Sequence, residues 1–284
     1  AKQLYALIEQ RGYDAVVCSH LFPMETLTFI RRHYPMRARC YGILSDYACI
    51  PFFAETELDG YMLPHADVRD ACLKAGMPGE KLTVTGMPVS DAFRHRLDKA
   101  KAREHLGLPL EKKIYLIMTG GIGCGDALGL CGAILKLPSD DALLCVLAGR
   151  NQTLLDAIKA RYGNDGQVMG VPFTDQVAAY MSAADVLLSK PGGISSSEAV
   201  VLNVPLVLTM AIPGVETLNA AFFARRGLAY FAQNEDEAAR CADRLIYDES
   251  AAQKMLAAQK RGIPDDGAER IAEQIEKDFE TRKV

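Results

Sequence analysis

Residues 190–198 combine two glycines with a carboxylate, an arrangement that suits a ligand carrying phosphate and hydroxyl groups. Gly192 and Gly193 lack Cβ atoms, so a ligand can approach the backbone N–H groups closely. Glu198 follows shortly after, and an ionised carboxylate accepts hydrogen bonds from a diol such as a ribose. The segment therefore predicts a sugar-nucleotide site.

These glycines lie between a predicted strand and a predicted helix. Residues 186–189 form an apolar run with strand character, and a helical pattern extends from Glu198 to Leu202. The N–H groups at a helix N-terminus lack partners within the helix, and the helix dipole favours negative charge there, so phosphate is the expected ligand. One structural alternative stays open, in which a serine caps the helix and Glu198 completes a capping box.

A second glycine-rich segment, residues 120–125, follows a predicted buried strand at 114–118. Four glycines in six residues cost about 1 kcal/mol each against alanine in regular structure, which favours a close approach of a ligand to the backbone. The segment has no Gly-Lys-Ser/Thr ending and departs from the dinucleotide spacing. Neither ATP nor NAD is therefore indicated.

Strand and helix patterns alternate along the chain, which predicts an α/β protein with parallel sheets. We predict a first domain over residues 1–96, a linker over 97–112 and a second domain over 113–262. The expected strands cover residues 15–19, 39–44, 60–63, 82–85, 114–118, 143–147, 167–171, 186–189 and 205–208.

The composition excludes several classes of protein. With 284 residues, of which 49% are hydrophobic, the chain can form two cores, and its net charge of −4 gives no general attraction to nucleic acid. Eight cysteines without a C-x-x-C pair indicate reduced thiols in the cytoplasm. No apolar run reaches about 18 residues, so membrane contact would be peripheral. Without an Asp-x-Asp motif, we expect no metal site.

Four segments together resemble one family, the processive diacylglycerol glycosyltransferases, which includes the plant monogalactosyldiacylglycerol synthases. The segments are residues 120–125, 170–173, 190–199 and 213–219. The resemblance covers nearly the whole chain and implies two Rossmann-like domains, the glycosyltransferase-B (GT-B) fold. It also implies that residues 263–284 form a helix that returns to the first domain. The chain starts after an earlier strand and a Gly-Gly-His loop of the family, so we expect the first domain to be incomplete at its N-terminus.

The resemblance implies a UDP-sugar donor in the second domain and no further cofactor. Phe173 would lie near the uracil, with an ordinary core phenylalanine as the alternative. Glu216 and Asn219 are three residues apart on one helix face and would hold the hydroxyls of the sugar. The expected donor-binding residues are Gly121, Gly123, Phe173, Gly192, Gly193, Ile194, Ser195, Glu198, Glu216 and Asn219.

Two residues of the first domain are catalytic candidates. His20 and Asp46 each follow a predicted strand, where open α/β sheets bind their ligands. His20 matches a family histidine and would contact the sugar or assist the base, with a structural histidine as the alternative. The family pattern after Asp46 is replaced here by residues 47–51, so a helix-capping role is an equal alternative.

A basic run in the first domain favours an anionic membrane surface. Residues 31–39 contain four arginines and no acid. The first 103 residues carry 14 basic and 12 acidic side chains, whereas the remainder carry 18 and 24. A solvated helix end would explain the run equally well.

The resulting hypothesis is transfer of a hexose from a UDP-sugar to a lipid, with diacylglycerol first among the acceptors, at the inner face of the membrane. The reaction would invert the anomeric carbon: a base deprotonates the acceptor hydroxyl while the helix end and the glycine segments stabilise the departing UDP. Two alternatives remain, an enzyme similar to UDP-N-acetylglucosamine 2-epimerase and a donor-binding subunit without catalysis. The identity of the sugar stays open.

Overall fold

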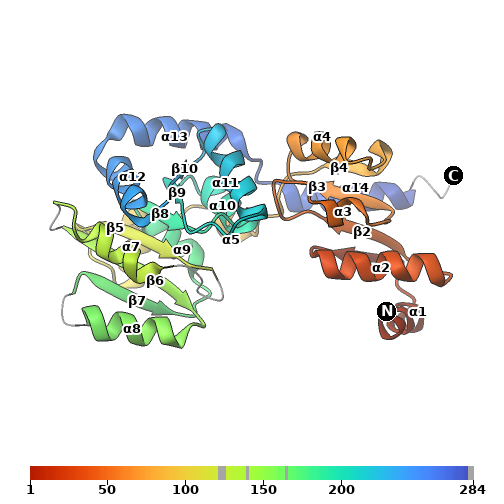
Figure 1. Ribbon diagram of the computed structural model, residues 1–284, viewed down its shortest axis with the longest axis horizontal. Helices are drawn as coiled ribbons and strands as arrows, with labels where there is room; N and C mark the ends of the chain where they lie inside the picture. The colour runs from red at the N-terminus through yellow and green to blue at the C-terminus, as the bar shows by residue number, and fades with distance from the viewer. Residues whose placement is uncertain (121–125, 139–140, 164–165, 281–284) are drawn as a thin grey trace. The chain divides into compact units, whose positions relative to one another are not determined.

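The computed structural model describes residues 1–120, 126–138, 141–163 and 166–280. It confirms the predicted α/β class, with two sheets whose paired strands are all parallel. The chain divides into two compact units (Figure 1). Unit 1 contains residues 1–88 and 264–284, and unit 2 contains residues 89–263.

Unit 1 is built on a sheet with the strand order β1-β2-β3-β4. Its strands are β1 (Ala15–Cys18), β2 (Arg39–Ile43), β3 (Gly60–Leu63) and β4 (Leu82–Val84). Its helices are α1 (Lys2–Arg11), α2 (Leu21–His33), α3 (Pro51–Ala54), α4 (Ala66–Lys74), the short 3-10 helix η1 (Gly79–Lys81) and α14 (Gly267–Glu280).

Helices α2 and α14 cover opposite faces of this sheet, as the contacts of two successive residues of β2 show. Successive residues of a strand point to opposite sides of the sheet. Tyr41 of β2 packs against Met62 and against Ile271 of α14. A Cβ atom at the next position, Gly42, would lie 3.1 Å from the sulfur of Met24 in α2. The sheet of unit 1 is therefore enclosed by segments from both ends of the chain.

Two glycines permit the close approach of the segment that leads into α14. Gly86 has a φ of +95°, and a Cβ atom there would lie 2.9 Å from the ring of Pro264. A Cβ atom at Gly267 would lie 2.3 Å from the carbonyl oxygen of Met87. Larger residues at either position would push the returning segment away from the end of the first part of unit 1.

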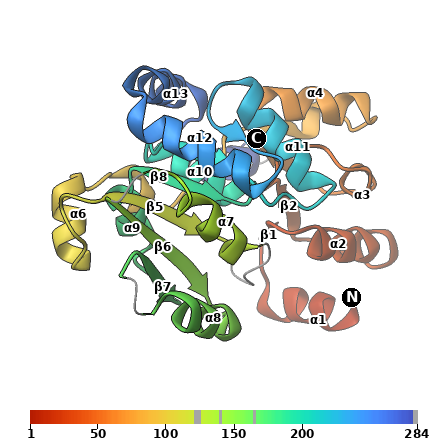
Figure 2. The ribbon, with the colours of Figure 1, turned by 60° about the vertical axis from the view of Figure 1, so that its left-hand side comes forward.

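Unit 2 contains a sheet with the order β10-β9-β8-β5-β6-β7. Its strands are β5 (Lys113–Met118), β6 (Ala142–Gly149), β7 (Val168–Pro172), β8 (Val186–Ser189), β9 (Leu206–Leu208) and β10 (Tyr230–Phe231). Its helices, which Figures 1 and 2 show on both faces of the sheet, are α5 (Asp91–Arg94), α6 (Lys99–Leu106), α7 (Ala127–Ile134), α8 (Gln152–Tyr162), α9 (Val177–Ala183), α10 (Gly193–Val201), α11 (Val215–Arg225), α12 (Glu235–Tyr247) and α13 (Glu249–Gly262).

This strand order is that of a doubly wound fold. The first strand of the unit, β5, is central, with β6 and β7 on one side and β8, β9 and β10 on the other. The winding therefore reverses between β5 and β8, and ligands of open α/β sheets bind beyond the carboxyl ends of the strands at such a reversal. Both glycine-rich segments of the sequence begin at these two strand ends.

Residues 97–112, predicted as a linker, are instead part of unit 2. The side chain of Arg103 in α6 is buried and donates to the carbonyl oxygen of Ala183 at 3.0 Å and to the carboxylate of Asp185 at 2.7 Å. Lys99 donates to the same carboxylate at 2.8 Å. The charge of this stretch therefore serves an internal ion-pair network, and the boundary between the units falls at residue 88.

Candidate functional site

The segment between β8 and α10 presents free backbone donors at the reversal point of unit 2. Gly192 is the N-cap residue of α10, with φ −70° and ψ 134°, and as a glycine it has no side chain to cap the helix. The capping-box alternative for Glu198 is therefore wrong. Because the first amides of a helix have no partner within it, those of Gly193, Ile194 and Ser195 can bind an anion.

Glu198 lies in the second turn of α10 and is partly buried. Its carboxylate makes no hydrogen bond or ion pair with any other residue that the structure describes. Burial raises the pKa of Glu198 to about 7. A buried carboxylate without a protein partner is suited to a hydrogen-bond donor from a ligand.

An ion pair connects the segment after β8 with the start of α11. The ammonium of Lys190 lies 2.9 Å from the carboxylate of Glu216, whose second oxygen accepts a hydrogen bond from the Ile212 amide at 2.7 Å. Both side chains are largely buried, with exposed fractions of 13% and 21%. Glu216 retains acceptor capacity for a hydroxyl, and Lys190 brings positive charge to the end of β8.

Asn219 lies one turn after Glu216 in α11 but is fully buried. Its amide donates a hydrogen bond to the carbonyl oxygen of Pro191 at 3.0 Å. This contact favours a role in holding the segment before α10. Direct contact with a sugar hydroxyl stays a prediction.

The second glycine-rich segment is described only in part. Gly120 follows β5 with a φ of +77°, whereas Gly121 and Gly123 lie outside the described residues. Beside it, the hydroxyl of Thr119 is buried without a hydrogen-bond partner among the described residues, as is that of Ser196 in α10. These two buried hydroxyls, one directly after β5 and one in α10, add polar groups near the same reversal point.

Phe173 follows β7 and is 63% exposed, so it is not an ordinary core residue. The guanidinium of Arg150, which follows β6, lies 4.9 Å from the centre of its ring. An exposed aromatic face with a neighbouring cation can stack with a planar base. The prediction that Phe173 lies near a uracil is compatible with this geometry and stays a prediction.

The two candidates of unit 1 both lie at the carboxyl edge of its sheet, after the neighbouring strands β1 and β2. His20 is exposed and caps α2, because its Nδ1 accepts a hydrogen bond from the Phe22 amide at 3.3 Å. In the neutral ring this places the proton on Nε2. Asp46 is half-buried. Catalytic roles for both residues stay predictions.

Lys190 is the first residue of the glycine-rich motif, and its role is visible only in the folded structure. Its partner Glu216 is 26 residues away in the sequence, and only folding brings the two together.

No group of three or more metal-binding side chains occurs among the described residues. The same part of the chain contains no helix with the length and apolar character needed to cross a membrane.

Comparison with known proteins identifies the family. The family model for monogalactosyldiacylglycerol (MGDG) synthase matches residues 1–89, and the model for the glycosyltransferase family 28 C-terminal domain matches residues 132–275. The chain belongs to this glycosyltransferase family. The family assignment made from the sequence motifs is therefore confirmed.

Curated members of the family are similar along most of this chain. A processive diacylglycerol beta-glucosyltransferase of Bacillus licheniformis is 28% identical over 258 residues, which are 89% of this chain and 66% of the relative. One from Bacillus thuringiensis is 25% identical over 276 residues, which are 96% of this chain and 70% of the relative. The family member described here thus spans about two thirds of the length of these relatives.

Solved structures confirm the fold. A UDP-GlcNAc 2-epimerase from Neisseria meningitidis bound to UDP-GlcNAc gives a TM-score of 0.75 at 16% identity, covering 97% of this chain and 80% of that one. A glycosyltransferase from Rickettsia africae gives 0.67 at 17% identity, covering 98% and 79%. At these identities the likeness establishes the GT-B architecture of this glycosyltransferase family member, which epimerases share.

Proposed function

We propose that this chain binds a UDP-hexose in unit 2 and takes part in transfer of the hexose to a lipid acceptor, with diacylglycerol first among the acceptors. The observation that carries the proposal is the set of groups at the reversal point between β5 and β8. Three groups belong to segments that begin there or pack against it: the start of α10 with its glycine N-cap, the Lys190–Glu216 ion pair, and the carboxylate of Glu198, which has no partner among the described residues.

Each group suits one part of the donor. The amides at the start of α10 and the ammonium of Lys190 suit the diphosphate, because both favour negative charge. Glu198 suits the ribose hydroxyls, Phe173 the uracil and Glu216 the hydroxyls of the hexose. With the negative charge of the leaving UDP held by amides and Lys190, no metal ion is required in this proposal.

The transfer itself would proceed by direct displacement with inversion. A base takes the proton of the acceptor hydroxyl, the acceptor oxygen bonds to the anomeric carbon, and the bond to UDP breaks. We propose that His20 assists at this step in unit 1. The exposed side chains of Phe22, beside His20, and Phe52, after β2, offer apolar surface for a lipid on the same sheet edge.

Two assays of the 284-residue chain test the proposal. Calorimetry should detect binding of UDP and of UDP-hexose but no binding of ADP. Incubation with UDP-[14C]glucose or UDP-[14C]galactose and diacylglycerol vesicles should yield labelled glycolipid. His20→Asn keeps a helix cap, whereas His20→Ala removes it. If His20 acts on the reactants, both variants should lower turnover while UDP affinity stays unchanged. Failure to bind UDP above ADP would contradict the donor assignment.

An epimerase similar to the UDP-N-acetylglucosamine 2-epimerases is the second candidate. It is favoured by the TM-score of the Neisseria meningitidis epimerase structure, 0.75, against 0.67 for the Rickettsia africae glycosyltransferase. Incubation with UDP-N-acetylglucosamine alone separates the two. Appearance of the 2-epimer without a lipid would support the epimerase, and UDP binding without either product would support a donor-binding subunit.

A further inference from the structure

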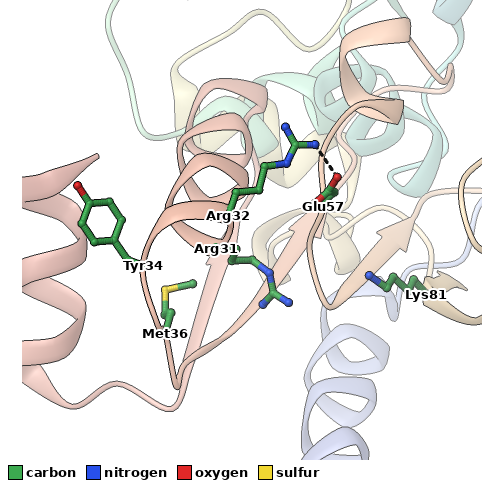
Figure 3. Close-up of a pocket in the computed structure, with 6 residues that line it drawn as sticks. All are labelled: Arg31, Arg32, Tyr34, Met36, Glu57 and Lys81. Carbon is green, nitrogen blue, oxygen red and sulfur yellow. Dashed lines mark hydrogen bonds and ion pairs between the residues drawn. The ribbon is translucent and has the colours of Figure 1, made fainter.

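A cavity of about 430 Å³ in unit 1 is lined by three cationic side chains. Its lining residues are Arg31, Arg32, Tyr34, Met36, Glu57 and Lys81. Figure 3 shows Arg31 and Lys81 extending into this space from opposite sides, with Arg32 and Glu57 paired beside them. None of these residues has a role in the function proposed above.

The cavity lies at the amino edge of the sheet of unit 1. Arg31 and Arg32 belong to the last turn of α2, before β2, while Glu57 precedes β3 and Lys81 immediately precedes β4. His20 and Asp46 follow β1 and β2 at the carboxyl edge. In a parallel sheet these edges are opposite, so the cavity is separate from the candidate acceptor side.

Arg31 is a fixed part of the cavity wall. Both its terminal nitrogens donate to the carboxylate of Asp59, one of them at 3.0 Å, and the same carboxylate accepts from the Cys40 amide at 2.8 Å. This bidentate arrangement orients the guanidinium, and the side chain of Arg31 is 29% exposed. Arg31 therefore shapes the cavity, with its charge balanced by Asp59.

Arg32 and Lys81 are the available cations. Arg32 pairs with Glu57, but their side chains are 52% and 57% exposed, and such surface pairs exchange readily for another anion. Lys81 donates to the carbonyl oxygen of Leu58 at 2.9 Å and forms no ion pair with a described carboxylate. With Arg31 balanced by Asp59 and Arg32 by Glu57, the ammonium of Lys81 leaves the cavity with a net positive charge.

We propose that this cavity binds the phosphate group of a phosphate ester, held by Lys81 and Arg32. Lys81 supplies a compact charge with donors to spare, and Arg32 supplies a planar pair of donors that matches phosphate oxygens. Glu57, released from Arg32, would accept a hydrogen bond from a hydroxyl of the esterified alcohol. The phosphate has two possible sources, a soluble ester or a lipid headgroup. The proposal is independent of the glycosyl transfer.

The other two arginines of the basic run do not share this cavity. Arg37 is 87% exposed and pairs with Asp14 at 3.3 Å. Arg39 donates to the backbone carbonyl of Asp278 at 2.8 Å and lies near the ring of Phe279 in α14. The run 31–39 is therefore divided by the fold, and the cavity gains its third cation from Lys81 instead.

The methyl group of Met36 gives a local signal for binding. In the full 284-residue chain carrying 13C-methyl methionine, glycerol 3-phosphate and inorganic phosphate should shift the Met36 resonance with saturation. Chloride at equal ionic strength should not. Arg32→Gln with Lys81→Gln should weaken this binding at least about tenfold, because charge-assisted hydrogen bonds are lost.

Arg37→Gln with Lys74→Gln is the matched control, since it removes the same charge from exposed positions outside the cavity. Its phosphate affinity should stay within about twofold of the wild type. Equal responses of the two double variants, or the same Met36 shift with chloride, would overturn the proposal. Circular dichroism verifies that both double variants are folded.

Vesicles distinguish the two sources. If the phosphate belongs to a lipid, vesicles of phosphatidylcholine with phosphatidic acid should sediment the wild type and the control variant more than the Arg32/Lys81 variant. If it belongs to a soluble ester, sedimentation should be equal for all three while the Met36 titration still separates them. Loss of sedimentation in both double variants, with no Met36 shift, would mean diffuse surface charge and would overturn the cavity.

Discussion

Glu198 should make donor binding dependent on pH. Burial raises the pKa of its carboxyl group to about 7, and a diol that donates hydrogen bonds favours the ionised form. Affinity for UDP-glucose, measured by calorimetry, should therefore rise about tenfold between roughly pH 6 and 8. Glu198→Gln should remove this dependence. An equally steep rise in the variant would assign the effect to another group.

The same pKa has a consequence for stability without ligand. Because the folded pKa of Glu198 lies above its unfolded value, the native state binds more protons between the two values. The contribution of Glu198 to the free energy of unfolding is thus largest at low pH and falls as the pH rises toward 7. Donor binding should offset this loss.

Substitutions in the ion pair between Lys190 and Glu216 should affect the binding of UDP and of UDP-hexose differently. Glu216→Ala should weaken UDP-hexose binding by about 1–3 kcal/mol through loss of a hydroxyl partner, without weakening UDP, since Lys190 keeps its charge. Lys190→Ala should weaken both ligands. Asp236→Ala, at an exposed position of α12, is the control and should change neither affinity. Equal losses of UDP and UDP-hexose in Glu216→Ala would refute its role.

The start of α10 permits a test of backbone access. Gly192 has a negative φ, and a Cβ atom there would meet only the Ser195 hydroxyl, at 3.2 Å. Gly192→Ala should therefore keep the protein stable while weakening UDP binding, because the methyl group covers the amides. Gly107 ends α6 with a φ of +65° and open space around it, so Gly107→Ala should cost about 1 kcal/mol of stability and leave UDP affinity unchanged. Thermal unfolding and calorimetry give the two quantities.

The network around Asp185 should hold α6 against the rest of unit 2. Burial alone would raise the pKa of Asp185, but hydrogen bonds from Lys99 and the Ile114 amide, with the charges of Lys99 and Arg103, lower it. Its stabilisation is present above the unfolded pKa near 3.8 and is lost as the pH falls below it. Asp185→Ala should destabilise the protein by about 3–5 kcal/mol at neutral pH, because Arg103 stays buried without its partner. A smaller loss, in urea unfolding, would show that water replaces the carboxylate.

Sequence patterns predict the parts of this fold that are local. The strands β5, β6 and β8 are predictable because a buried strand is an apolar run of consecutive residues. Strand β10 has only two residues, too few for a sequence pattern to indicate a strand. The stretch 97–112, predicted as a linker, belongs to unit 2, where Lys99 and Arg103 pair with Asp185, which lies 82 residues after Arg103. Glu198 and Gly192 lie in one motif. By contrast, Lys190 and Glu216, which form an ion pair, and Arg32 and Lys81, which line one cavity, come together only in the folded chain.

Two units with separate cores should respond separately to ligands. In calorimetric scans of the full chain, UDP should raise the transition temperature of unit 2 only. At a UDP concentration 100 times its dissociation constant, the free energy of unfolding of unit 2 should rise by about 2.7 kcal/mol. Asp185→Ala should lower that same transition, and Gly267→Ala, which meets the Met87 carbonyl, should lower only that of unit 1. A single transition that moves in all three experiments would mean that the units unfold as one.

Unit 2 is inserted into unit 1, because α14 is made after all of unit 2 yet packs on Tyr41 and Met62. During synthesis, residues 89–263 emerge as one continuous stretch and can fold while translation proceeds. The sheet of unit 1 emerges first but must wait, with one face uncovered, until Ile271 and Phe279 have left the ribosome. Until then, the apolar face of this sheet is open to aggregation or to a chaperone.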